Sequence, residues 1–442
     1  MAIGRIKVQC FAGDSDVPVE GSRVKISPSN ENLQARSNFR VDEVTNSSGI
    51  TRTIEVEAPS LEYSQNPSQN APYSLYDIRV EKDGFQDVLI RNVQVFPERT
   101  AIQNVNLELA PQNRASRAEV IVILPNTLFG NYPVKIPENP EKPLPPPSSG
   151  VVLAKPVVPE FITVHQGGPN DTSAPNYKVR YKDYIKNVAS SEIYSTWPDS
   201  TIRANVYCIV SFTLNRIYTE WYRGKGKNFD ITSSTAYDHA FNYGRNIYDS
   251  ISAVVDSIFS SYVTRFGRKQ PLLTQYCDGK NVTCPQWLSQ WGSKYLGDQG
   301  RVPYDILTYY YGYDIELKRA EQVSGSPSSY PGYSLTRASR GEPVRVVQNF
   351  LNRISNNYPL IPKLAVDGIY GSGTANSVKI FQQTFNLPAT GVVDYATWYQ
   401  ISNIYVGVTR IAELRYDNIF YPPNSTSSYR GIEVPNFHYP ND

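Results

Sequence analysis

Glu192 is well placed in this sequence for proton transfer, because apolar residues follow it directly. Ile193, Tyr194 and Trp197 can surround its carboxyl group, and burial among such side chains raises a carboxyl pKa. A glutamic acid of raised pKa can donate a proton to a leaving oxygen and later take one back. The competing interpretation is a glutamate that faces solvent at the end of a helix.

Ordinary glycoside hydrolysis uses two carboxylates, one as acid and one as base or nucleophile. Four aspartates lie near Glu192 in the sequence and could act as its partner. They are Asp183, Asp199, Asp230 and Asp238. A two-carboxylate glycoside hydrolase is therefore one alternative.

Histidine and cysteine are scarce, with 3 His and 4 Cys in 442 residues. These counts disfavour a multi-histidine metal centre and weaken a Ser-His-Asp interpretation. The one plausible zinc set is His239 with Cys277 and Cys284, but the stretch CDGKNVTC also suits a disulfide-closed loop or free thiols. We expect no metal and no cofactor. Cys208 lies in an apolar run and is not expected to be a nucleophile.

The charges nearly cancel, with 43 Lys+Arg against 41 Asp+Glu. Such a chain has no overall field to attract nucleic acid, so we expect no nucleic-acid partner. No apolar run reaches the roughly 18 residues of a membrane span. The start, MAIGRIKVQC, lacks the apolar core of a secretory signal. The 33 tyrosines suit sugar-binding surfaces and ordinary cores equally well.

Residues 161–330 form the unit that must position Glu192. Ile202, Val206 and Ile209 recur near helical spacing in the segment STWPDSTIRANVYCIVSFTLNRIYTEWY, which predicts a long buried helix. A second helical stretch, RNIYDSISAVVDSIFSSYV, follows, and FITVHQG reads as a strand. The mixture predicts a mixed α/β unit in a multidomain α+β protein.

Two separated blocks of this unit resemble the sporulation protein D (SpoIID) family. The first, DYIKNVASSEIYSTWPDSTIRANVYCIVSFTLNRIY, is similar to the family's helix, Glu, tryptophan-proline turn and long helix. The second, LSQWGSKYLGDQGRVPYDILTYYYG, resembles its S-Q-x-G-A and Y-x-x-I-L-x-x-Y-Y-x-G segments. The resemblance implies a peptidoglycan lytic transglycosylase with Glu192 as the catalytic residue. In that reaction the C6 hydroxyl of muramic acid attacks its own anomeric carbon, so one carboxyl group suffices.

The same resemblance implies substrate-binding residues. Ser289, Gln290 and Gly292 fall in the S-Q-x-G block, and Tyr237 lies in SSTAYDHAF, where the family has a polar contact segment. Trp287 and Trp291, beside the first set, suit either substrate or core. The stretch LLTQYCDGKNVTC departs from the Ser/Gly-rich strand end of the family.

Residues 335–405 resemble the type 1 peptidoglycan-binding domain, a three-helix fold. The matching patterns include D-G-I-Y-G-x-x-T and T-G-V-V-D-x-x-T-W. We expect Ser372 and Asp394 to be helix N-caps, and we take Asp367 and Tyr370 as candidate ligand contacts. The expected structural residues are Gly368 and Gly371 in a turn and Phe381 and Trp398 in the core.

Residues 1–130 predict an antiparallel β-sandwich, because six segments alternate apolar and polar residues. They resemble carboxypeptidase regulatory-like modules, which are usually accessory. Residues 131–160 are dense in proline and predict a solvated, semi-rigid linker. A protease could cut it near Ser149, Gly150 and Val151, although a plain spacer is the alternative. Residues 406–442 predict an irregular tail.

This order of units resembles the spore cortex-lytic enzymes. The resemblance implies a zymogen that the mother cell makes without a signal peptide and that resides in the cortex and coat region of the spore. A subtilisin-like Csp protease would activate it at germination, and spore cortex peptidoglycan would be its substrate. We expect the residues before the cut to restrain the enzyme. A non-catalytic peptidoglycan-binding spore structural protein is a further alternative.

Overall fold

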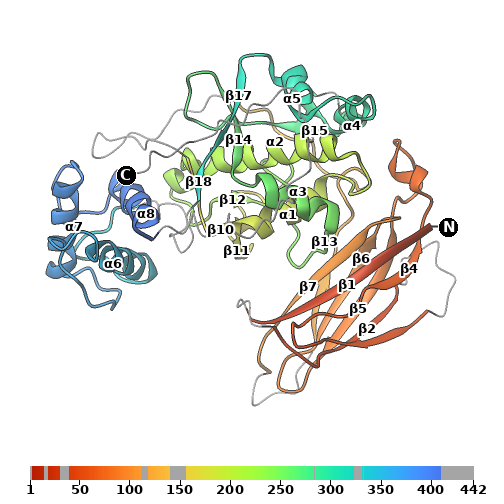
Figure 1. The fold of residues 1–442 in the computed structure, drawn as a ribbon, viewed down its shortest axis with the longest axis horizontal. Coiled ribbons are helices and arrows are strands. Elements are labelled where there is room, and N and C mark those ends of the chain that lie inside the picture. The colour runs from red at the N-terminus through yellow and green to blue at the C-terminus, as the bar shows by residue number, and fades with distance from the viewer. Residues whose placement is uncertain are drawn as a thin grey trace, which may run out of the picture.

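The computed structural model describes residues 2–13, 18–29, 39–110, 118–139, 156–282, 284–322, 331 and 333–409. A strand-rich N-terminal region, a mixed central region and a small helical C-terminal region follow one another along the chain (Figure 1). The prediction of a mixed α/β protein is confirmed.

The N-terminal region contains two sheets that share a hydrophobic core. Strand β1 shows why they form, since Ile6, Val8 and Cys10 are fully buried between more exposed neighbours. One sheet has the order β13 (Ile247–Tyr248), β7 (Thr100–Leu107), β1 (Ala2–Ala12), β4 (Ile54–Ala58). The other has the order β3 (Val41–Val44), β2 (Arg23–Pro28), β5 (Ser74–Glu81), β6 (Val88–Val95), β8 (Glu119–Val122).

The prediction of an antiparallel sandwich is wrong for two pairs of strands. Strand β1 runs parallel to β7, and β6 runs parallel to β8. The alternation of buried and exposed residues predicts a strand but carries no information about the direction of its neighbour. Strands β3 and β8 were also not expected, because each has only 4 residues and no fully buried position.

The first sheet continues into the central region. In β13, Ile247 and Tyr248 pair antiparallel with Ile102 and Ala101 of β7. At this border the ring of Phe96 lies 5.2 Å from the rings of both Tyr194 and Tyr248. The N-terminal region is therefore joined to the central region through a common sheet and a common core.

The central region is built around α2 (Asp199–Tyr218), the long helix that the sequence predicted. It is buried over most of its length, even at Arg216, which is 1% exposed. The other helices are α1 (Tyr181–Glu192), α3 (Asp249–Ile258), α4 (Gln290–Asp298) and α5 (Pro303–Tyr311), with short turns η1 (Leu61–Ser64) in the N-terminal region and η2 (Arg223–Lys225).

Short sheets surround these helices. The three-stranded sheet contains β11 (Asn176–Arg180), β10 (Phe161–His165) and β12 (Ile231–Thr232). The two-stranded sheets pair β14 (Ser261–Arg265) with β17 (Ile315–Arg319), β15 (Tyr276–Cys277) with β16 (Leu288–Ser289), and β9 (Val157–Val158) with β18 (Glu321–Gln322).

Most residues at the start of the proline-rich segment, 131–139, are exposed, as the sequence predicted, but the segment is also anchored to the central region. Lys135 is 7% exposed, and Glu138 pairs with Arg216 of α2 at 2.5 Å. Proline density predicts an extended backbone, but it does not tell whether that backbone lies in water or against protein. Residues 140–155, which include Ser149, Gly150 and Val151, lie outside the described residues.

The C-terminal region contains α6 (Glu342–Ser355), α7 (Ser372–Thr384) and α8 (Tyr395–Thr409). Asp394 is the expected cap, accepting a bond from the amide of Thr397 at 2.8 Å. Ser372 is not a cap, because α7 has Gly371 at that position and Ser372 already lies inside the helix. Helix α8 includes residues 406–409 of the predicted irregular tail, and the rest of that tail lies outside the described residues.

Two buried glutamines give this region an internal repeat. Gln348 accepts a bond from the amide of Gly368 and donates to Ile369. Gln382 does the same with Gly391 and Val392. Gly368 has a φ of 72° and Gly391 a φ of 68°, a left-handed conformation that favours glycine. Each glutamine therefore fastens one tight turn to the helix that carries it.

Replacement of Phe96 by Ala should destabilise the N-terminal and central regions together. Phe96 is fully buried between them, and such a truncation costs about 3–5 kcal/mol. Urea unfolding followed by tryptophan fluorescence and circular dichroism measures the loss. Leu109→Ala is the control, because Leu109 is 75% exposed and its truncation should cost less than about 0.5 kcal/mol. Separate transitions for the two signals would contradict a common core.

Candidate active site

Glu192 is the last residue of α1 and is 4% exposed. The chain leaves the helix at Ile193, and a turn leads to Trp197 and then to the proline that precedes α2. The indole of Trp197 donates to the carbonyl of Ser64, so η1 of the N-terminal region fixes this turn. Glu192, Ile193, Tyr194 and Trp197 are all buried.

Both carboxylate oxygens of Glu192 accept hydrogen bonds. The amide of Ala240 donates to Oε1 at 2.8 Å, and the hydroxyl of Thr127 donates to Oε2 at 3.1 Å. The side-chain amide of Gln290 donates to the main-chain carbonyl of Glu192 at 3.0 Å. Polar donors that the sequence did not indicate therefore hold the buried Glu192.

A positive charge lies beside Glu192. The ammonium group of Lys135 donates to the carbonyl of Asp238 and lies 5.1 Å from the ring centres of both Phe212 and Tyr276. Burial lowers the pKa of Lys135 to about 8, while the negative charges of Glu192 and Asp238 oppose that shift. Lys135 is mainly protonated at neutral pH, so it compensates the buried carboxylates.

Of the four predicted partner aspartates, Asp238 interacts with Lys135, as Glu192 does. It is fully buried, and its Oδ1 accepts a bond from Arg216 at 2.6 Å. Its Oδ2 accepts bonds from Tyr222 and from both the amide and the hydroxyl of Thr232. These donors hold Asp238 in a structural role.

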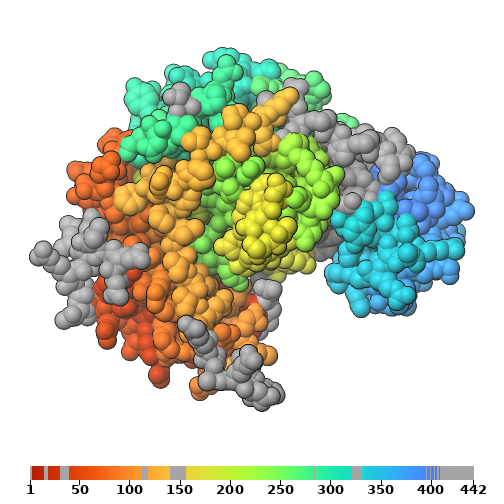
Figure 2. Space-filling view, turned by 180° about the vertical axis from the view of Figure 1, so that it is seen from behind, coloured from red at the N-terminus to blue at the C-terminus, as the bar shows by residue number. Residues whose placement is uncertain are grey.

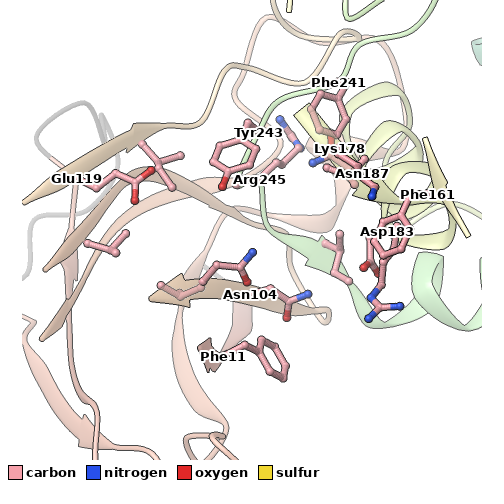
Figure 3. A pocket seen from close by; sticks show the side chains of 18 residues that line it. Phe11, Asn104, Glu119, Phe161, Lys178, Asp183, Asn187, Phe241, Tyr243 and Arg245 are labelled. Atoms are coloured by element: carbon pink, nitrogen blue, oxygen red, sulfur yellow. The ribbon is translucent and has the colours of Figure 1, made fainter. Parts of the chain in front are cut away.

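The other three aspartates lie in different surroundings. Asp199 is exposed and pairs with Arg203, and Asp230 pairs with Arg223. Asp183 lines a cavity of about 430 Å³ between the N-terminal and central regions (Figure 3). The structure brings none of the three to the carboxylate of Glu192.

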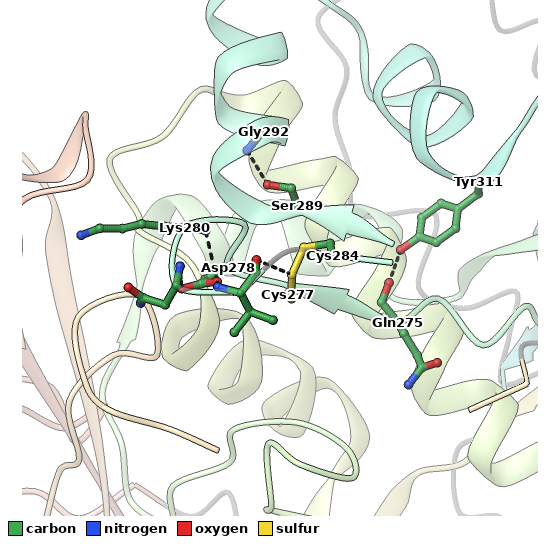
Figure 4. The surroundings of a disulfide bond; sticks show 10 residues. Gln275, Cys277, Asp278, Lys280, Cys284, Ser289, Gly292 and Tyr311 are labelled. Carbon is green, nitrogen blue, oxygen red and sulfur yellow. Dashed lines mark hydrogen bonds between the residues drawn. A yellow bond between two sulfur atoms is a disulfide. The ribbon is translucent and has the colours of Figure 1, made fainter. Parts of the chain in front are cut away.

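The possible zinc set is not assembled. Cys277 and Cys284 form a disulfide that closes a short loop (Figure 4). His239 is fully buried, and its Nδ1 lies 3.0 Å from the hydroxyl of Tyr184. Within the described residues, no cluster of three or more His, Cys, Asp or Glu could hold a metal ion. Burial raises the pKa of Cys208 to about 12, which disfavours a thiolate there.

Of the predicted substrate-binding residues, the structure brings Gln290 into contact with Glu192. Ser289 caps α4 by accepting a bond from the amide of Gly292 (Figure 4). Gly292 is needed for packing, because a Cβ there would lie 2.1 Å from the hydroxyl oxygen of Tyr310. Tyr237 is partly exposed, and its carbonyl accepts a bond from Arg216.

An open groove lies next to this block. It has a volume of about 690 Å³, and the disulfide-closed loop forms part of its wall. Its lining includes Gln275, Trp287, Ser289, Tyr309 and Tyr310. The other tryptophan of the block, Trp291, is 9% exposed and packs against Trp197.

The two candidate ligand contacts of the C-terminal region have structural roles. Tyr370 is fully buried, and its hydroxyl donates to the carbonyl of Gly391, so its proposed ligand contact is wrong. Asp367 is exposed but accepts bonds from Gln348 and Ile369 in its own turn. These bonds lower the pKa of Asp367.

Sequence reasoning missed Thr127 and Lys135. Both precede the central unit, in segments taken for the sandwich and the linker. The only signal for Lys135 is its place between Val134 and Ile136 in a stretch otherwise rich in proline. That pattern is too short to distinguish a buried lysine from an exposed one.

Residues 340–401 match the family described as putative peptidoglycan binding domain. The chain therefore carries a peptidoglycan-binding domain, which fits association with the cell wall and with peptidoglycan as a partner. No curated protein matches the chain. Within the described residues, no helix is both long and apolar enough to cross a membrane.

Comparison with solved structures finds partial similarities. The Bacillus anthracis TIE protein is 18% identical, with a TM-score of 0.17, over 25% of this chain and 17% of that one. The minor pilin GBS52 of Streptococcus agalactiae is 12% identical, with a TM-score of 0.16, over 26% of this chain and 48% of that one. A catechol 1,2-dioxygenase of Acinetobacter radioresistens is 15% identical, with a TM-score of 0.16, over 27% and 58%. The chain thus covers less than two thirds of each, and these similarities do not bear on its activity.

The free energy of unfolding should increase as the pH rises from 8 to 9.5, because Lys135 loses its proton in the folded protein. The pKa of Lys135 is about 8 when folded and near 10.5 when exposed. The unfolded chain therefore binds more protons in this window, which increases the free energy of unfolding by about 1.5 kcal/mol. Urea unfolding at each pH, compared with Lys135→Met, isolates the increment because other groups titrate equally in both proteins. Equal pH dependence in the two proteins would contradict a buried ammonium group.

Proposed function

We propose that this protein is a peptidoglycan lytic transglycosylase of the spore cortex, of the type of the cortex-lytic enzyme SleC. In this proposal the central region cleaves the bond between N-acetylmuramic acid and N-acetylglucosamine, and the C-terminal domain holds the enzyme on its insoluble substrate. The products carry 1,6-anhydro-muramic ends.

The contact between Gln290 and Glu192 is the observation that carries the proposal. The two residues are 98 positions apart and belong to the two blocks that resemble the SpoIID family. A matching pair of sequence blocks gains weight when its central residues meet in space, beside a groove that can admit a polymer. The peptidoglycan-binding domain of the same chain supplies the substrate class.

The proposed reaction needs one carboxyl group. In the proposed step Glu192 acts in its carboxylic acid form, not in the charged form that Lys135 accompanies in this structure. It gives its proton to the glycosidic oxygen as the bond from that oxygen to muramic C1 breaks. The muramic C6 oxygen then bonds to C1, and Glu192 takes the proton of that hydroxyl. No water is consumed, and the carboxyl group returns to its first state. The amide of Ala240 and the amide group of Gln290 keep Glu192 in place.

We further propose that the protein is a zymogen. It would be made in the mother cell without a signal peptide and cut near Ser149, Gly150 and Val151 by a subtilisin-like Csp protease during germination. The contacts of Thr127 with Glu192 and of Glu138 with Arg216 support a restraining role for residues before the cut.

A non-catalytic peptidoglycan-binding spore structural protein is the second candidate. The specific observation in its favour is that Glu192 is 4% exposed and both of its carboxylate oxygens are hydrogen-bonded. A two-carboxylate glycoside hydrolase has less support, because Asp238 is held by Arg216, Tyr222 and Thr232.

Product analysis by mass spectrometry tests the proposal. Cortex peptidoglycan is incubated with the intact chain and with chain cut within residues 140–155. Transglycosylation yields muropeptides that are lighter by one water than hydrolysis products. Glu192→Gln should lower the rate about 10²–10⁴-fold, because the amide cannot donate or accept the proton.

Asp199→Asn is the matched control, since Asp199 is exposed and lies near Glu192 in the sequence. It should keep the wild-type rate. Products with reducing ends would show that the enzyme is a hydrolase and not a transglycosylase. The absence of product from both intact and cut protein would favour the structural protein.

N-terminal sequencing of the protein from germinated spores tests the zymogen. We expect a new N-terminus within or next to residues 149–151. Recovery of only the intact chain from extracts that degrade cortex would exclude activation by cleavage there.

A further inference from the structure

The carboxylate of Glu192 is covered by other parts of its own chain. A carboxyl group that exchanges a proton with a sugar must come within about 2.6–3.2 Å of the sugar oxygen. In this structure Thr127 occupies that range at Oε2 and Ala240 at Oε1. Ala240 belongs to the central region, whereas Thr127 belongs to residues 124–139, which we call the strap.

The strap contains a turn at residues 127–130, continues without regular secondary structure to residue 139, and makes both backbone and side-chain hydrogen bonds to the central region. In Figure 2 the orange chain that leads up to residue 139 crosses the face of the green central region. The bonds include Asn126 to the carbonyl of Ser190, Thr127 to the carbonyl of Ser191, Ile136 to the carbonyl of Ala236, and Glu138 to the side chain of Gln275.

Lys135 is the most deeply inserted charged side chain of the strap. It is 7% exposed, whereas its neighbours Val134 and Ile136 are 58% and 44% exposed. Its ammonium group lies between the rings of Phe212 and Tyr276 and interacts with the charge of Glu192.

The open groove adjoins the strap. Gln275 lines the groove, and its side chain donates to the carbonyl of Ile136 at 3.0 Å. On the same wall Tyr309 is 69% exposed, and its ring lies edge-on to Tyr310 at 4.9 Å. Exposed aromatic faces beside amide and hydroxyl groups suit the apolar faces and polar edges of sugar rings.

We infer that the groove is the open half of a glycan-binding cleft and that the strap fills the other half, in front of Glu192, with Thr127 and Lys135. The ligand class is a β-1,4-linked chain of N-acetylated amino sugars. The inference rests on the proposed function of Glu192 and adds how the cleft is closed. A glycan reaches Tyr309 in the closed protein but reaches Glu192 only when the strap leaves.

Hydrogen exchange and glycan binding test the inference in the full chain. Lys135→Glu puts a negative charge at a position where the negative charges of Glu192 and Asp238 favour a positive one, so it should drive the strap out of its site. We expect the strap amides of Thr127 and Ile136 to exchange at least about tenfold faster, while those of α2 stay protected. Chitotetraose should bind at least about tenfold more tightly than to wild type, because more of the protein has an open cleft. Val134→Ala, at an exposed position of the strap, should match wild type in both measurements.

The groove has its own variant and control. In the Lys135→Glu background, Tyr309→Ala should abolish the gain in chitotetraose affinity. Tyr313→Ala should preserve it, because Tyr313 is 84% exposed and does not line the groove.

Three results would overturn the inference. They are unchanged strap exchange in Lys135→Glu, faster exchange with unchanged glycan affinity, and a gain in affinity that survives Tyr309→Ala. Release of anhydro-muropeptides at equal rates by wild type and Lys135→Glu would also overturn it while leaving the proposed function intact. If chitotetraose binds as expected but no variant releases anhydro-muropeptides, the proposed function is rejected and the closed cleft is supported.

Discussion

Compensation of buried charge in the central region is the constraint on which the other parts depend. Arg216 satisfies both Asp238 and Glu138, and Lys135 lies near Glu192. A buried charge that loses its partner costs several kcal/mol. Because Lys135 and Glu138 precede the central region in sequence, that region in its present form needs chain from outside its own boundaries.

The elements of the fold could largely be predicted from residue patterns, whereas their connections could not. Helix α2 is buried over most of its length, and β1 alternates buried and more exposed residues. Both patterns are visible in a short stretch of sequence. The parallel pairing of β1 with β7 and the addition of β13 to the same sheet join residues that are far apart in sequence. Such pairings depend on how the whole core closes, and no local pattern encodes them.

In the candidate site, too, local sequence patterns predict some residues and give no sign of others. Glu192 and Gln290 could be found because each lies in a block with several matching neighbours, and the structure joins them. Thr127 and Lys135 could not, since their surroundings in sequence suggest exposure. Tyr370 shows the opposite error: a position can match a family pattern because it fills the core and bonds to Gly391, without touching a ligand. Motif matches identify folds more securely than they identify contact atoms.

The shared sheet has a consequence for any cut in residues 140–155. Strand β13 follows that segment in sequence, but it pairs with β7, which precedes it. Phe96, Tyr194 and Tyr248 also remain packed across the border. A nicked chain would therefore persist as two complementary fragments held by a common sheet and core. Backbone cleavage and fragment separation would be distinct events, and the slower of them would set the lag before the two pieces part.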